Sequence, residues 1–155
     1  VAILLNNLGD VANAQGQPEQ ALVYLQESLA LKQAANNERG MIFSLVHLGH
    51  TYWRLEQTAE AAAAYGQALA LAQKLDVKPL LLAALVGLAE VAMKRGEAAL
   101  AQQMLWLAAA HPASWQRVRD EATAVASQHH ILLEPIPTPL PDLTAVTQQG
   151  LNLVG

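Results

Sequence analysis

The chain has 155 residues, of which 53% are apolar and only 14% charged, against roughly 25% charged residues in ordinary soluble domains. Its formal net charge is −4 and it contains no run of Lys or Arg. It therefore lacks the basic patch that direct binding of nucleic acid needs. The lack of cysteine excludes disulfides and thiolate chemistry. No uninterrupted apolar stretch reaches the ~18 residues of a membrane span, so a membrane is not an expected partner.

The first predicted element is a pair of helices over residues 1–36. Apolar and small residues recur at positions 5, 8, 9 and 12, a spacing that places them on one face of a helix. The helix ends at the sequence QGQPEQ, where Gly16 suits a left-handed C-terminal cap and Pro18 suits the first turn of the next helix. The helical pattern already runs at residue 2 and the chain opens at Val1 without Met. We therefore expect this unit to be truncated and the chain to be part of a longer protein.

The same pattern returns every 40 residues, in units expected over residues 37–76 and 77–111. The second unit has Glu56 in place of the turn glycine, and Thr58 there can cap the following helix. A fixed period of roughly 20 to 50 residues is typical of a solenoid. We expect the small residues to let two helix backbones cross closely, because the ridges of one helix then settle into the grooves of the other. A shift of 40 aligns Gly9 with Gly49 and Ala89, Ala21 with Ala61 and Ala101, and Leu5 with Leu45 and Leu85.

After the repeats, the sequence predicts a capping helix over residues 112–130. Trp115, Val118, Ala122 and Val125 form one stripe of a helix that begins near Ser114, a residue suited to the N-cap position. Such a helix would cover the outer face of the last repeat, which has no further repeat to meet.

Residues 131–155 form a proline-rich tail. Its segment EPIPTPLP cannot be helical, so we expect it to run extended. The weakly amphipathic segment DLTAVTQQGLNLVG follows, and two interpretations stay open for it. One is a disordered terminus. The other is packing onto an apolar surface, either the groove of the repeats or a neighbouring molecule, through Leu140, Leu143, Leu151 and Leu153.

These units resemble the tetratricopeptide repeat. The resemblance rests in the first unit on Leu8-Gly9, Gly16, Ala21, Leu25 and Ser28, and in the second on Leu48-Gly49, Tyr52, Ala61, Tyr65 and Ala68. The units are 40 residues long rather than the usual 34 or so, which is similar to the C-terminal arms of bacterial STAND-type signalling ATPases and transcriptional activators. The resemblance implies an all-α fold, a right-handed α-solenoid, in which the first helices of successive units line a concave surface that binds peptide or protein.

The residues expected to face this concave surface come from the first helix of each unit. In the second unit, positions 45, 48, 49 and 52 form the packed stripe, while 43, 46, 50 and 53 form the stripe that faces the groove. An exposed aromatic pair, Phe43 and Trp53, resembles an anchor site with a polar edge. The alternative is that these aromatics are buried against each other or against the tail. The predicted binding residues are Asn6, Asp10, Asn13, Phe43, Val46, His50, Trp53, Arg54, Val86, Glu90 and Lys94.

The sequence offers little for catalysis, a cofactor or a metal. It has no Gly-x-Ser-x-Gly, no phosphate-binding glycine loop and no His-Glu-x-x-His, so we expect no enzymatic activity. His47 and His50 lie three residues apart and could share a metal, with Asp10 or Glu90 as the nearest further ligands. Solvated or hydrogen-bonded histidines are favoured, because a metal site needs more ligands and an oriented surrounding shell.

The sequence thus predicts a cytoplasmic protein- or peptide-binding module, the sensor or scaffold arm of a larger bacterial regulator. A ligand in the groove would stabilise one arrangement of the arm and shift a switch elsewhere. Two alternatives stay open. One is a structural module that self-associates through the tail or the open first repeat. The other is a small-molecule receptor whose pocket is formed by Phe43, Trp53 and His50.

Overall fold

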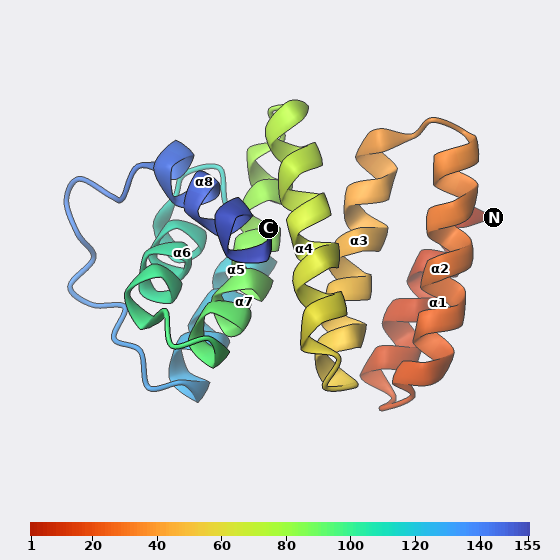
Figure 1. Ribbon diagram of the computed structural model, residues 1–155, viewed down its shortest axis with the longest axis horizontal. Coiled ribbons are helices and arrows are strands. Elements are labelled where there is room, and N and C mark those ends of the chain that lie inside the picture. Colours follow the sequence, from red (N-terminus) through yellow and green to blue (C-terminus); the bar gives the residue numbers. More distant parts are fainter.

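The computed structural model describes residues 1–155 and contains eight helices and no strand. The first six helices form three antiparallel pairs that follow one another along the long axis of the molecule (Figure 1). The predicted all-α solenoid is therefore confirmed. None of the helices combines the length and the apolar character needed to cross a membrane. The helices are α1 (Ala2–Ala14), α2 (Pro18–Ala34), α3 (Glu38–Arg54), α4 (Thr58–Lys74), α5 (Lys78–Lys94), α6 (Ala98–Ala110), α7 (Gln116–Gln128) and α8 (Leu143–Val154).

The turns between these helices recur every 20 residues, which is half of the 40-residue sequence repeat. Each of the first five turns contains a residue with positive φ, at intervals of 20 residues: Gly16, Asn36, Glu56, Asp76 and Gly96. The left-handed conformation predicted for Gly16 is confirmed by its φ of 72°. Thr58, in contrast, is not a cap, because α4 has Gln57 at its N-cap position and no side-chain capping bond.

The helices form two layers. In the first layer α1, α3, α5 and α7 contact one another in that order, and the second layer contains α2, α4 and α6. Each second-layer helix contacts both the partner in its own pair and the first-layer helix that follows it in the chain. The main hydrophobic core runs continuously from Ile42 to Val146 and involves every helix from α3 to α8.

Small residues set the distance between the helices of a pair, as the sequence predicts. A Cβ atom at Gly9 would lie 2.5 Å from Cγ of Leu25, and a Cβ atom at Gly49 would overlap the ring of Tyr65. A Cβ atom at Gly87, a position that the repeat alignment does not single out, would overlap the same ring from α5. The fully buried Tyr65 therefore lies between two glycines of neighbouring repeats.

Helix α7 begins one residue later than expected and continues the first layer. The N-cap prediction for Ser114 is wrong, because Trp115 occupies that position and the Ser114 hydroxyl donates to the carbonyl of Ala108 at 2.6 Å. Val118 and Ala122 are buried, as their stripe predicts, and α7 contacts α5 and α6. This position brings one side of α7 beside the inner face of the repeats.

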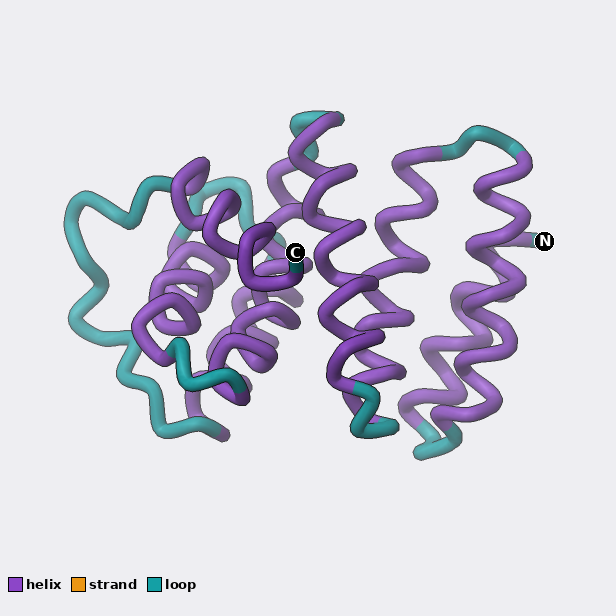
Figure 2. Tube along the Cα trace, in the orientation of Figure 1, coloured by secondary structure: helices purple, strands orange, loops and turns teal.

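The tail is non-helical only as far as residue 142. Figure 2 shows this long non-helical connection, and Gln102 and Trp106 of α6 donate to the carbonyls of Leu132 and Leu133 within it. For the segment that follows, the structure shows packing and not a disordered terminus, because α8 begins with Asp142 as its N-cap and packs on α4, α5 and α6. The four tail leucines do contact the core, but from the side of α4 and α6 and not in the groove of the first layer.

The weak amphipathic pattern expected for this segment is wrong, because α8 is the most clearly amphipathic of the eight helices. Helix α8 packs closely at Gly150, where a Cβ atom would lie 3.1 Å from Met104 and 3.2 Å from Leu69. Val146 is buried on the same face of the helix. Because Gly150 has no side chain, the backbone of α8 can approach these two residues closely.

Candidate functional site

The first layer forms an open cavity of about 590 Å³. Its walls come from α1, α3, α5 and α7, so helices from opposite ends of the chain meet there. This volume lies within the range of roughly 300–1,000 Å³ typical of ligand pockets. Seven of the predicted binding residues line it: Asp10, Asn13, His50, Trp53, Arg54, Val86 and Glu90.

The structure places the other four predicted residues outside this cavity. Asn6 is buried between α1, α2 and α3, where it accepts a hydrogen bond from Lys32. Phe43 and Val46 line a separate hollow of about 100 Å³ beside Trp115. Lys94 is exposed, and its ammonium lies 5.3 Å from the ring centre of Trp53.

The predicted aromatic pair is also separated. Phe43 stacks on Trp115, with ring centres 6.2 Å apart and an interplanar angle of 14°. Trp53 lies on the cavity wall instead. A single pocket formed by Phe43, Trp53 and His50 is therefore wrong, because α7 supplies an aromatic partner for Phe43 that the repeat pattern could not indicate.

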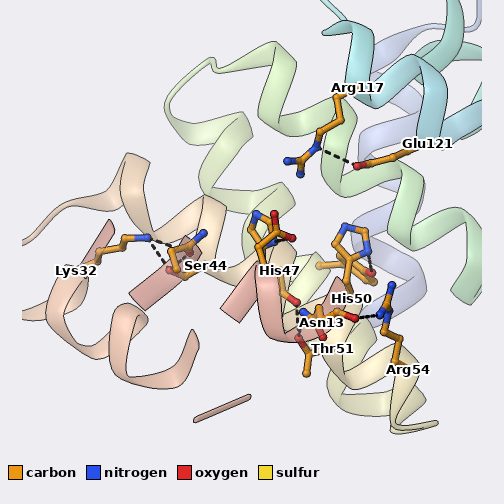
Figure 3. A network of polar contacts seen from close by, with 12 residues as sticks. Asn13, Lys32, Ser44, His47, His50, Thr51, Arg54, Arg117 and Glu121 are labelled. Atoms are coloured by element: carbon orange, nitrogen blue, oxygen red, sulfur yellow. Dashed lines mark hydrogen bonds and ion pairs between the residues drawn. The ribbon is translucent and has the colours of Figure 1, made fainter. Parts of the chain in front are cut away.

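A buried lysine explains the position of Asn6. Lys32 is 4% exposed, and its ammonium donates to Oγ of Ser44 at 2.8 Å and to Oδ1 of Asn6 at 3.2 Å (Figure 3). Burial lowers the pKa of Lys32. No carboxylate accepts from this ammonium, so neutral oxygens alone compensate its burial. The repeat alignment places Ala72 at the equivalent position of the second unit, so this cluster belongs to the first unit only.

On the α1 side of the cavity, Asp10 and His47 form a pair. Nδ1 of His47 lies 3.3 Å from Oδ1 of Asp10, and the hydrogen bond from His47 lowers the pKa of Asp10. Thr51 donates to the carbonyl of His47, so its hydroxyl oxygen must accept from Nδ2 of Asn13 at 2.8 Å. This fixes the orientation of the Asn13 amide and leaves its buried Oδ1 without a hydrogen-bond partner.

His50 contributes a neutral ring to the cavity wall. Burial lowers its pKa to about 3, while burial raises the pKa of Tyr65 well above its ordinary value. Nδ1 of His50 lies 2.9 Å from the Tyr65 hydroxyl, which has no other partner. Because a fully buried hydroxyl proton needs an acceptor, Tyr65 donates and His50 accepts. Nε2 of His50 then carries the proton.

Glu90 is the buried acid of the cavity. Its side chain is 11% exposed, and burial raises its pKa to about 7. The nearest basic atom is Nε2 of His129, at 4.0 Å from Oε1 of Glu90, and this nitrogen has no hydrogen-bond partner. That separation exceeds hydrogen-bonding distance, so the Glu90 carboxyl accepts no hydrogen bond from the chain.

Helix α7 contributes wall residues that the sequence analysis missed. Arg117 and Glu121 form an ion pair at 3.0 Å on this helix and lie across from His47 and His50 (Figure 3). Together with Ala124 and Gln128 they form a stripe at positions 117, 121, 124 and 128. This stripe is adjacent to the predicted packing stripe, and its helical spacing is the signal that could have revealed it.

The polar groups of the cavity do not converge on a metal site. No three His, Asp or Glu side chains of the chain come close enough together to hold a metal ion. His47 and His50, which the sequence places at a metal-sharing distance, turn to different partners, Asp10 and Tyr65. The arrangement suits hydrogen bonding and charge pairing with a ligand.

Stacked helix pairs with a shared inner face define the class of this protein as an α-solenoid of helix-turn-helix repeats. Residues 1–74 match the family model of the tetratricopeptide repeat, so this part of the chain consists of tetratricopeptide repeats, as its residues predict. Helices α5 and α6 continue the same pairing beyond the matched residues. No curated protein and no solved structure gives a significant match. Tetratricopeptide repeats are non-catalytic modules that bind protein partners and act as scaffolds.

Proposed function

We propose that this chain binds a segment of a protein partner in the cavity between α1, α3, α5 and α7. The cavity itself is the observation that supports this function, since a ligand-sized hollow lies on the face formed by the first helices of the repeats. Trp53 on its wall is the residue type most often found as an energetic anchor in protein interfaces. Neighbouring polar groups without partners, such as Oδ1 of Asn13, suit the recognition of a polar ligand group.

The position of α7 restricts the segment that can enter. Because α7 forms one wall, the inner face is not an open groove along its whole length. An extended strand that runs through it would meet this helix. A chain terminus, a tight turn or a single protruding side chain fits better, so the proposed partner presents one of these.

The proposed cellular role is that of a sensor or scaffold arm in a larger cytoplasmic bacterial regulator, of the kind found in STAND-type ATPases and transcriptional activators. Asp10 of α1 and Arg117 of α7 lie on the same cavity although more than one hundred residues separate them. A ligand that touches both helices stabilises one spacing of the first and last repeats. Such differential contact is what a ligand needs to shift a conformational equilibrium.

A capture experiment with matched aromatic variants tests the proposal. The folded chain, Trp53→Ala and Phe43→Ala serve as baits against a lysate of the source organism, after circular dichroism has shown equal helical content. Trp53 lines the cavity whereas Phe43 lies outside it. We expect a partner that the parent and Phe43→Ala retain and that Trp53→Ala loses. Equal capture by all three baits, or by none of them, would refute the proposal.

One observation favours self-association as a second function. Leu4, Leu8 and Val11 form an apolar stripe on α1 and are 62%, 39% and 51% exposed. Their equivalents in the second repeat, Ser44, Leu48 and Thr51, are buried in the solenoid, where α3 contacts α2. Sedimentation of the parent and of Leu8→Lys tests this function. A dimer that the substitution converts to a monomer would support it, and a monomeric parent would exclude it.

A further inference from the structure

We propose that Glu90 forms a subsite for a cationic N–H group of the partner, an ammonium or a guanidinium. This inference rests on the proposed function of the cavity and states which chemical group the cavity recognises. The group could come from a lysine side chain, an arginine side chain or a free amino terminus, which share a positive charge and hydrogen-bond donors.

The first argument is that the other charged groups on the cavity wall already have partners. Asp10 pairs with His47, and Glu121 pairs with Arg117. The guanidinium of Arg54 donates to the main-chain carbonyl of Asn13. Only the Glu90 carboxyl lacks a hydrogen bond from any of them.

The nearby lysine does not neutralise Glu90 either. Lys94 lies one helical turn further along α5, but its ammonium donates to Oγ1 of Thr58 at 2.6 Å and lies over the ring of Trp53. This contact also shows that the wall at Trp53 accommodates a cation, as aromatic rings do. Positive charge is therefore compatible with this part of the cavity.

The second argument is the burial of Glu90, which is 9% exposed as a residue. An ionised carboxylate in such a place is unfavourable unless a cation or several donors compensate it. Burial accordingly raises the pKa of Glu90 to about 7, so the carboxyl is only about half ionised at neutral pH. A cationic ligand group would favour the ionised form, and its binding would release a proton.

The third argument is an independent one and comes from Asn13. This residue is 5% exposed and lines the same cavity, and its Oδ1 has no partner. Glu90 and Asn13 both line the cavity with acceptors that no group of the chain bonds, and a donor-bearing ligand would satisfy them. The titratable groups that surround Glu90 are Asp10, His47, His50, Arg54, Tyr65, Arg117, Glu121 and His129. Of these, His129 alone has a basic atom as close as 4.0 Å to the carboxyl, and this separation is too long for a hydrogen bond.

Isothermal titration of the full chain with small probes tests the subsite. The cationic probes are butylammonium, butylguanidinium and glycinamide, which represent lysine, arginine and an amino terminus, and butyrate is the anionic control. Titrations at neutral pH in two buffers of different ionisation enthalpy measure proton release. We expect at least one cationic probe to bind and to release roughly half a proton, in line with the pKa of about 7 for Glu90.

Two variants make this test specific. Glu90→Gln should weaken binding of the cationic probe about tenfold or more, which corresponds to a loss of roughly 1.4 kcal/mol. Glu60→Gln, which removes an exposed carboxylate of α4 outside the cavity, should bind like the parent. Binding of butyrate in preference to the cations, binding of none of the cations, or unchanged binding by Glu90→Gln would overturn the inference.

The capture experiment separates this inference from the proposed function. If Trp53→Ala loses the partner and Glu90→Gln retains it with unchanged affinity, the cavity binds a protein and the cation subsite is wrong. If neither substitution changes capture, the proposed function fails as well.

Discussion

The substitution Glu90→Gln should make the stability of this protein less sensitive to pH. Burial raises the pKa of Glu90 from an ordinary value of 4.5 to about 7, so the folded chain holds this proton more tightly than the unfolded chain does. The stabilising effect of the proton is complete below pH 4.5 and is lost as the pH rises through 7. At about 1.36 kcal/mol for each pKa unit, the loss is roughly 3 kcal/mol.

Gln cannot ionise and therefore avoids this loss. Relative to the parent, Glu90→Gln should gain up to about 3 kcal/mol in unfolding free energy between acidic and mildly alkaline pH. His50 acts in the opposite direction. Its pKa is lowered to about 3 by burial, so its contribution to stability is lost as the pH falls below 6.5. This contribution is the same in both proteins and cancels when the variant is compared with the parent.

Urea unfolding of the parent, Glu90→Gln and Glu60→Gln over a series of pH values measures the effect. Far-UV circular dichroism is the appropriate probe, because the chain is helical throughout its repeats. A difference between Glu90→Gln and the parent that stays constant across the whole pH range would refute the reasoning. It would mean that the folded protein holds Glu90 in its ionised form, for example through a closer contact with His129.

Three further predictions concern the packing of the helices. Gly49→Ala should lower the unfolding free energy by roughly 1–3 kcal/mol, because the added methyl group overlaps the ring of Tyr65. In a helix with free space at this position, alanine would instead raise the unfolding free energy. A variant that is more stable than the parent in urea would contradict this packing. Lys32→Met should leave the unfolding free energy unchanged or raise it, because the buried ammonium has no carboxylate partner. Its two acceptors, the Ser44 hydroxyl and the Asn6 amide, also bond to each other and would stay paired without it. A loss above about 2 kcal/mol in urea unfolding would contradict this prediction. Val146→Ala should lower the unfolding free energy by roughly 1–3 kcal/mol and speed proteolysis within α8, because Val146 is buried against the core. An unchanged cleavage rate would show that α8 does not depend on this contact.

The repeated part of the fold could be predicted because its determinants lie close together in the sequence. The turn at Gly16 and the small residues at Gly9 and Gly49 act within a helix pair, so their spacing carries the information. The contact of α8 could not be predicted in the same way. Its central residue, Gly150, has no side chain, and its neighbours Leu69 and Met104 lie far away in the sequence.

The residues of the cavity likewise separate into those predicted from the spacing within one repeat and those whose positions depend on distant residues. The positions of His50 and Trp53 follow from the helical period of α3, and both residues line the cavity. Asn6 lies outside it because Lys32, on a different helix, draws its side chain into a buried cluster. Phe43 pairs with Trp115, which is 72 residues away, and such long-range pairing leaves no trace in the spacing of one repeat.

The first and last helices of the first layer expose different surfaces, and this difference bears on how copies of this chain could join. Helix α1 exposes its apolar stripe, while α7 exposes a polar stripe formed by Gln116, Asp120, Thr123 and Ser127. A head-to-tail filament requires two different complementary surfaces, whereas a closed two-fold pair requires only one surface that matches itself. Copies of this chain that join through α1 would bury the apolar stripe of both molecules and leave the polar stripes of both α7 helices exposed. Such a contact favours a closed pair over a head-to-tail filament.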